Sequence, residues 1–256
     1  MDERLRRLRN GNLALAVLHA GQAAVILALS NDFSLPVQGS FLDGPPGVTP
    51  LGPAETLWDV RLGPAVAAFL LLAALDHLLV ALPPVRGWYE RNLGRGVNVA
   101  RWLEYSLSAT IMVLLIAMLT GISNVAALIG IAGANVAMIL FGHLMERVND
   151  RVRPTDWLPF AYGCVAGIVP WVAITVQIAL SIDRGDGPPA FVYVIFFSLF
   201  ALFNSFAVNQ WLQYAKAGRW RDYLVGEWGY LVLSLTAKSL LAWLVFANVL
   251  LESTTG

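Results

Sequence analysis

Seven long apolar stretches limit what this chain can fold into more than any other feature of its sequence. A helix of about 20 apolar residues crosses the hydrocarbon core of a bilayer. Each stretch reaches that length, and the segments between them are polar or rich in helix-breaking residues. The sequence therefore predicts an all-α membrane protein, a bundle of seven transmembrane helices in which residues 1–256 form a single domain. The predicted crossings are residues 11–30, 62–82, 97–120, 122–144, 158–181, 190–212 and 226–250.

Charge is scarce and unevenly spread, which argues against a soluble domain. Charged residues make up 13% of the chain, too few for the surface of a soluble protein of 256 residues. No Asp, Glu, Lys or Arg lies between Glu104 and Glu146, a gap long enough for two crossings. The net charge of zero gives no indication of a nucleic-acid partner. Cys164 is the single cysteine and excludes an internal disulfide.

The N-terminus has two interpretations. Four arginines precede the first apolar stretch, and Ala28-Leu29-Ser30 resembles the cleavage site of a secretory signal. The apolar run is longer than a usual signal core, however, and it contains His19 and Gln22. We therefore expect a retained first helix.

One connection, residues 31–60, is much longer than the others. Asp43-Gly44-Pro45-Pro46-Gly47 is a strong turn signal, and apolar residues partly alternate before it at Phe33, Leu35 and Val37. The insertion is either a short β-hairpin or a structureless loop. Elsewhere the connections are short: Gly121 to Ser123 predicts a tight hairpin between the third and fourth crossings.

The distribution of Lys and Arg predicts the orientation in the membrane. Of the 17 basic residues, fourteen fall in the N-terminal segment and the second, fourth and sixth connections, whereas the opposite face has only Arg61 and Arg184. Basic loops stay in the cytoplasm. We expect a cell-membrane protein with its N-terminus inside, its C-terminus outside, and residues 31–60 as an extracellular insertion.

The remaining basic residue, Lys238, lies near the centre of the last crossing. A lysine side chain spans about 6 Å, too short to reach either interface from a depth of about 15 Å. A charge at that depth costs about 2.5–3.5 kcal/mol. It needs a buried carboxylate, a water-filled path, or chemical conversion of the amine, and buried lysines often form Schiff bases.

The candidate carboxylate is Glu104, roughly 10 Å into the third crossing. Alternatively, Glu104 pairs with Arg101 at the membrane rim. His19 and His77 are predicted at a similar depth on the first two crossings, so either a polar cavity forms there or each histidine is an ordinary core residue. Ser234 lies one turn before Lys238 on the same helical face.

Two further features leave alternatives open. We take Asp76 and Glu104 to be the only acids embedded in the membrane, and Asp76 either faces the same cavity or pairs with a loop arginine. Large aromatic side chains are concentrated in the fifth and sixth crossings. They could wall a dry slot for an elongated apolar ligand, or they could be ordinary membrane packing. They are Trp171, Phe196, Phe197, Phe200, Phe203 and Phe206.

Several segments together resemble the heliorhodopsins, a family of retinal proteins with inverted topology. The last crossing, around Lys238, resembles the retinal-binding helix of that family, and the other matching segments extend over nearly the whole chain. The matching segments are Val232–Ser239, Trp102–Ser108, Gly167–Trp171, Phe203–Phe206, Asn31–Phe33 and Gly44–Gly47.

The resemblance implies all-trans retinal joined to Lys238 as a protonated Schiff base, with Glu104 as its counterion. It also implies that His19 and His77 line a polar cavity and accept the proton jointly after photoisomerisation. Members form homodimers, have a slow photocycle and mostly do not pump ions, which suits a signalling role with a cytoplasmic partner. The remaining pocket positions that it implies are Met138, Trp171, Phe203, Gln210 and Ser234.

Three functions are compatible with these residues. The first is a light sensor without net transport, with no enzymatic activity and no metal site. The second is a light-driven or light-gated proton transporter, which needs a proton route on both sides of Lys238. The third is a retinal-free transporter or membrane enzyme that uses Lys238 as a charged relay. The position of both expected embedded acids on the cytoplasmic side favours the sensor.

Overall fold

The computed structural model describes residues 3–149 and 154–250, and this part of the chain is mostly helical. Seven of its helices are long and apolar enough to cross a membrane, which confirms the predicted seven-helix bundle. The elements are α1 (Glu3–Leu29), β1 (Ser34–Gly39), β2 (Glu55–Arg61), α2 (Leu62–Ala81), α3 (Pro83–Gly94), α4 (Val99–Leu119), α5 (Val125–Val148), α6 (Leu158–Arg184), α7 (Ala190–Tyr214), the 3-10 helix η1 (Gly218–Arg221), α8 (Tyr223–Val245) and the π-helical turn η2 (Phe246–Leu250).

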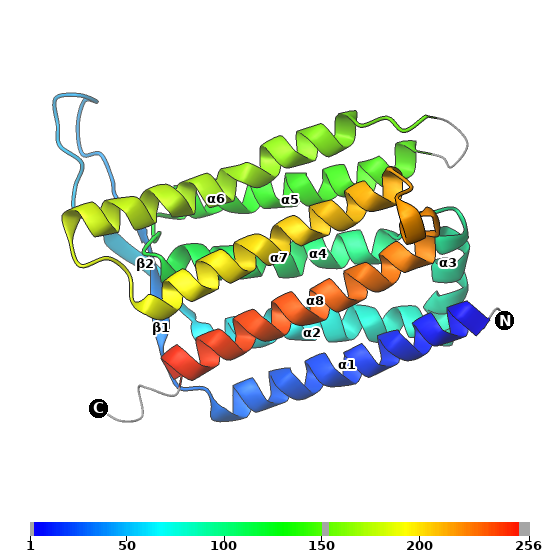
Figure 1. Ribbon diagram of the computed structural model, residues 1–256. Helices are drawn as coiled ribbons and strands as arrows, with labels where there is room; N and C mark the ends of the chain where they lie inside the picture. The colour runs from blue at the N-terminus through cyan, green and yellow to red at the C-terminus, as the bar shows by residue number, and fades with distance from the viewer. Residues whose placement is uncertain (1–2, 150–153, 251–256) are drawn as a thin grey trace.

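The long helices run side by side along one axis, and the two ends of the bundle differ (Figure 1). The start of α1, the short helix α3 and η1 lie at one end, which we call the N-terminal end. The strands β1 and β2 lie at the other end, which we call the sheet end. Each of the long helices runs from the N-terminal end to the sheet end.

The long insertion forms a β-hairpin at the sheet end. β1 pairs antiparallel with β2, with an irregularity between Val37 and Gln38. Gln38 donates its backbone N–H to the Ser123 carbonyl over 2.8 Å, and Ser123 donates its hydroxyl to the Gln38 side chain over 2.7 Å. These bonds fasten the hairpin to the tight turn between α4 and α5. The expected hairpin is therefore confirmed, and the structureless alternative is wrong.

The connection after α2 contains a further short helix, α3. Leu82 is extended and ends α2, because a residue before proline is kept out of the helical region. Proline is nevertheless well suited to the first turn of a helix, where its missing N–H costs nothing. Pro83 therefore begins α3, whose Tyr89 and Leu93 are buried against Leu8 of α1.

The first helix packs against α2 along the bundle. Ala23 and Ile26 are fully buried in the main apolar core, and Arg9 donates to the Ala81 carbonyl at the end of α2. Such packing favours the retained-helix interpretation over a removable signal. Apolar side chains also cover the outward faces of the helices, as a bilayer requires: Val17, Leu75 and Val165 are all largely exposed.

Candidate functional site

Lys238 and Glu104 form a buried ion pair between α8 and α4. The Lys238 Nζ lies 3.3 Å from each carboxylate oxygen of Glu104, and the two side chains are 4% and 6% exposed. The same nitrogen donates to the Ser234 Oγ over 2.7 Å and lies 4.9 Å from the centre of the Tyr105 ring. The alternative pairing of Glu104 with Arg101 at the rim is wrong.

Two histidines stand beside this pair. The rings of His19 and His77 stack in parallel, with their centres 5.7 Å apart. Both rings lie close enough to Lys238 to interact with it electrostatically. The His77 Nδ1 is 2.8 Å from the Asn12 Oδ1. Within the described residues, neither ring nitrogen of His19 has a hydrogen-bond partner, and neither has Oε1 of Glu104. These side chains from α1, α2 and α4 form a polar region next to Lys238. Buried polar atoms almost always have a hydrogen-bond partner, so those without one in the protein are expected to bind water.

Asp76 belongs to this region by its electrostatics. It is partly buried on α2 and lies close enough to Glu104, Lys238 and Arg101 to interact with them electrostatically. The structure gives it no ion pair with any described loop arginine. Of its two expected arrangements, pairing with a loop arginine is therefore not found among the described residues, and a place in the polar cavity stays a prediction.

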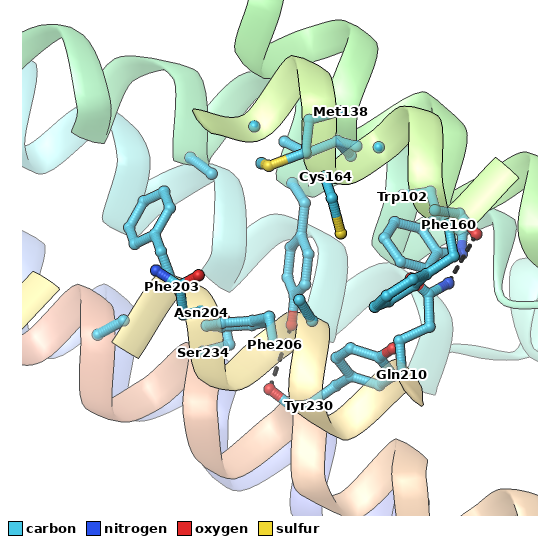
Figure 2. Close-up of a pocket in the computed structure, with 18 of the residues that line it drawn as sticks. Trp102, Met138, Phe160, Cys164, Phe203, Asn204, Phe206, Gln210, Tyr230 and Ser234 are labelled. Carbon is cyan, nitrogen blue, oxygen red and sulfur yellow. Dashed lines mark hydrogen bonds between the residues drawn. The ribbon is translucent and has the colours of Figure 1, made fainter. Parts of the chain in front are cut away.

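An apolar cavity of about 270 Å³ lies between α4, α5, α6, α7 and α8 (Figure 2), and Lys238 is one of the residues that line it. Lys238 and the five further pocket positions implied by the resemblance line it, whereas Glu104 is not among the lining residues. Trp171 contacts Phe203 edge to face, with ring centres 5.5 Å apart. Those lining positions are Met138, Trp171, Phe203, Gln210, Ser234 and Lys238.

The aromatic stripe of the sixth crossing divides between two places. Phe203 and Phe206 line the cavity. Phe196, Phe197 and Phe200 instead line a shallower hollow beside it, and the Phe197 side chain is 64% exposed. Only part of the stripe therefore lines the cavity, while Phe196 and Phe200 pack against the Trp171 ring from outside it.

Four of the aromatic residues that line the cavity were not among the residues singled out for the pocket from the sequence. They are Trp102, Tyr105, Phe160 and Tyr230. A helical pattern could have found the first two, because Trp102, Tyr105, Ala109 and Met112 recur every three or four residues on one face of α4. In Figure 2, Trp102, Gln210 and Tyr230 gather at one end of the cavity, away from Ser234 and Phe203.

A second buried ionic group lies nearer the N-terminal end and corrects two expectations. Arg101 forms ion pairs with both Glu146 and Glu227, and none of the three side chains is more than 5% exposed. Asp76 and Glu104 are therefore not the only embedded acids, and Arg101 is not a loop residue. The sequence concealed this group because each charge stands near the end of a different apolar stretch, where it looks like a loop residue.

Comparison with known proteins assigns the family. The family model described as Heliorhodopsin matches residues 8–250, nearly the whole chain. None of the curated proteins compared with the chain matches it.

Solved structures of microbial rhodopsins share the fold. The light-driven proton pump LR (Mac) from Leptosphaeria maculans is 18% identical with a TM-score of 0.68, and the match covers 96% of each chain. Halorhodopsin, a light-driven chloride pump, is 16% identical with a TM-score of 0.69, covering 100% of this chain and 98% of that one. The transmembrane domain of Salpingoeca rosetta rhodopsin phosphodiesterase is 15% identical with a TM-score of 0.67, covering 98% and 86%. At such identities the likeness concerns the fold alone.

Proposed function

Because the chain belongs to the heliorhodopsin family, we propose that it is a light sensor with all-trans retinal bound covalently to Lys238. Glu104 is the counterion of the resulting protonated Schiff base, and light absorption drives no net ion transport. One observation carries this proposal. A lysine buried inside a membrane-spanning helix lines an apolar cavity, and its nitrogen lies 3.3 Å from a single carboxylate.

The residues present fit such a chromophore. The cavity of about 270 Å³ is close to the lower end of the usual range for ligand pockets, roughly 300–1,000 Å³. Its walls are mainly aromatic and aliphatic, as an elongated polyene needs. Its few polar groups include Lys238 and Ser234 near Glu104, and Gln210, whose amide donates to the Gly142 carbonyl over 2.9 Å. Such groups fix orientation without making the slot polar.

When bound, retinal supplies absorption of visible light and an isomerisation that light drives. The chain supplies the attachment and the electrostatics. Lys238 provides a nitrogen that burial keeps away from water, and Glu104 balances the positive charge on that nitrogen. Ser234 accepts a hydrogen bond from the same nitrogen, which holds it on the side of α8 that faces Glu104.

The polar region offers a place for a proton that leaves the Lys238 nitrogen. Within the described chain, Oε1 of Glu104 and both ring nitrogens of His19 have no hydrogen-bond partner, although Oε1 lies 3.3 Å from the Lys238 nitrogen. His77 is stacked on His19 and interacts electrostatically with Lys238. We propose that His19 and His77 share the proton. The change in charge then alters the packing of helices that a partner reads.

The one-sided distribution of buried acids in the described part of the chain supports a sensor over a transporter. The fully buried acids of the described residues are Glu104, Glu146 and Glu227. All three lie in the half of the bundle nearest the N-terminal end, since α4 and α8 start there and α5 ends there. Glu146 and Glu227 lie on the same side as Glu104, so these additional acids do not extend a proton route toward the sheet end.

The orientation, assembly and domain organisation are parts of the same proposal. With Arg101 counted as buried, eleven basic residues of the described chain remain at the N-terminal end and two, Arg61 and Arg184, at the sheet end. This imbalance supports a cytoplasmic N-terminus in the cell membrane. We further propose that residues 1–256 act as one domain, that the protein is a homodimer, and that a cytoplasmic partner receives the signal.

A transport assay tests the sensor against its rival. Cells that contain the retinal-loaded protein are suspended without buffer and illuminated, and the pH of the medium is recorded. A sensor gives no light-induced change. A change that a protonophore abolishes would instead support the alternative, a light-driven or light-gated proton transporter.

A further inference from the structure

The buried ionic group at Arg101 joins three helices that carry the cavity. Arg101 on α4 pairs with Glu146, near the end of α5, and with Glu227, near the start of α8. Asn98 completes the group: its backbone N–H donates to Glu146 over 2.8 Å, and its side chain donates to Glu227 over 2.7 Å. We call Asn98, Arg101, Glu146 and Glu227 the Arg101 cluster.

This cluster is in direct contact with the wall of the cavity. The Trp102 indole N–H donates to Glu146 over 2.7 Å. The Arg101 guanidinium lies 3.8 Å from the centre of the Tyr230 ring and 4.6 Å from that of Trp102. Trp102 and Tyr230 both line the cavity, at its end away from Ser234 (Figure 2). A displacement of either ring therefore acts on the cluster without any intervening residue.

The arrangement is sensitive to such a displacement. One guanidinium is shared between two buried carboxylates, so the group has an excess of negative charge and depends on its N–H donors. Glu146 takes hydrogen bonds from Asn98, Arg101 and Trp102. Loss of the Trp102 bond would weaken the position of Glu146 and shift Arg101 toward Glu227.

The consequence would appear at the N-terminal end of the bundle. The Arg101 cluster connects the end of α5 to the start of α8, together with the Tyr223 hydroxyl, which donates to Glu146 over 3.3 Å. Buried ion pairs contribute little stability compared with apolar residues of the same size, and a switch is a better explanation for keeping one. The exposed residues next to these helix ends, Arg147 and Arg219, lie on the surface that we assign to the cytoplasm.

We propose that the Arg101 cluster is the switch that converts a change in the cavity into a movement of α5 against α8 at the N-terminal end. This inference rests on the proposed function, because it needs a chromophore that responds to light. Glu146 acts in it as a positioning residue, through Trp102. The expected movement is on the order of 1–2 Å or more, the scale of helix shifts in known switches.

Pulsed electron–electron distance measurements on the full chain test the proposal. Because Cys164 is the only cysteine, Cys164→Ala gives a background in which Arg147→Cys and Arg219→Cys carry the two spin labels. Samples loaded with retinal are frozen in the dark or under illumination, and each distance shift is divided by the photoconverted fraction. The light-induced shift should fall to less than half in Glu146→Gln, which removes the charge but keeps the shape.

A matched control separates the switch from a general loss of charge. Glu90 also pairs with an arginine at the same end of the molecule, Arg86 on α3, but outside the bundle. Glu90→Gln should leave the shift unchanged. If Glu146→Gln does not fold, Trp102→Phe replaces it in the experiment, since it removes the N–H donor to Glu146. The light-induced shift should then also fall to less than half.

The outcomes are distinct for the two proposals. A protein without a visible absorption band would overturn the proposed function. A protein that photoconverts normally but gives no distance shift, or a full shift in both Glu146→Gln and Trp102→Phe, would overturn the switch and leave the sensor proposal standing.

Discussion

Replacement of the counterion tests the site through the colour of the protein. Glu104→Gln removes one negative charge and keeps the size of the side chain. The Lys238 nitrogen and the Glu104 oxygens are 3.3 Å apart and nearly inaccessible to solvent. With an effective dielectric constant of about 20, two unit charges at that separation attract by about 5 kcal/mol.

That attraction stabilises the ground state, in which the positive charge is concentrated at the Lys238 nitrogen. The excited state, in which the charge is spread along the chromophore, gains less from Glu104. Loss of the carboxylate therefore lowers the excitation energy by a fraction of about 5 kcal/mol, a red shift on the order of tens of nanometres.

The assay is the absorption maximum of the purified, retinal-loaded variant at neutral pH. Glu104→Asp serves as a control, because it keeps the charge and should shift the maximum less than Glu104→Gln does. Glu90→Gln controls for removal of a carboxylate far from the cavity and should leave the spectrum unchanged. An unaltered maximum in Glu104→Gln would exclude Glu104 as the counterion.

Three further predictions follow from the geometry. Arg101→Met leaves Glu146 and Glu227 as unpaired buried charges, which costs about 3–5 kcal/mol and should lower the thermal bleaching midpoint by about 10 °C. The triple variant that adds Glu146→Gln and Glu227→Gln should recover most of this loss of stability. No recovery would contradict the pairing. In Gly142→Ala the new methyl would lie 2.6 Å from the Trp102 ring, so the variant should bind less retinal or absorb at a different wavelength, whereas Gly133→Ala, which meets nothing within 4 Å, should match the parent protein. Replacing His19 and His77 together by Phe should slow proton loss from the Lys238 nitrogen in flash spectroscopy more than either single change does; a double variant no slower than the single ones would exclude a shared acceptor.

The membrane-spanning part of the fold was predictable from the sequence because it depends on length and hydropathy alone. The hairpin could be anticipated from the turn residues Gly44 to Gly47, but its pairing with the Ser123 turn could not, since that contact joins distant segments. Helix α3 was not predicted from the sequence, because Pro83 follows directly on the second apolar stretch and indicates the end of a helix. The same residue type that ends one helix is compatible with the first turn of the next.

For the site, isolated charges were more informative than aromatic residues. Lys238 and Glu104 stand out in apolar segments, where a charge needs a reason to be present. Trp102 and Tyr230 do not stand out, because aromatic residues are common throughout membrane helices. The Arg101 cluster could not be read from the chain, since its members are separated by 45 and 126 positions and become neighbours only when α4, α5 and α8 pack.

The most direct test of the central claim, a retinal bound covalently to Lys238, is the visible spectrum of the protein loaded with all-trans retinal, before and after illumination with hydroxylamine. A Schiff base should give a visible band that disappears under these conditions as retinal oxime forms, and Lys238→Ala should be colourless. A visible band that persists in Lys238→Ala, or a protein that never acquires colour with retinal, would contradict the assignment.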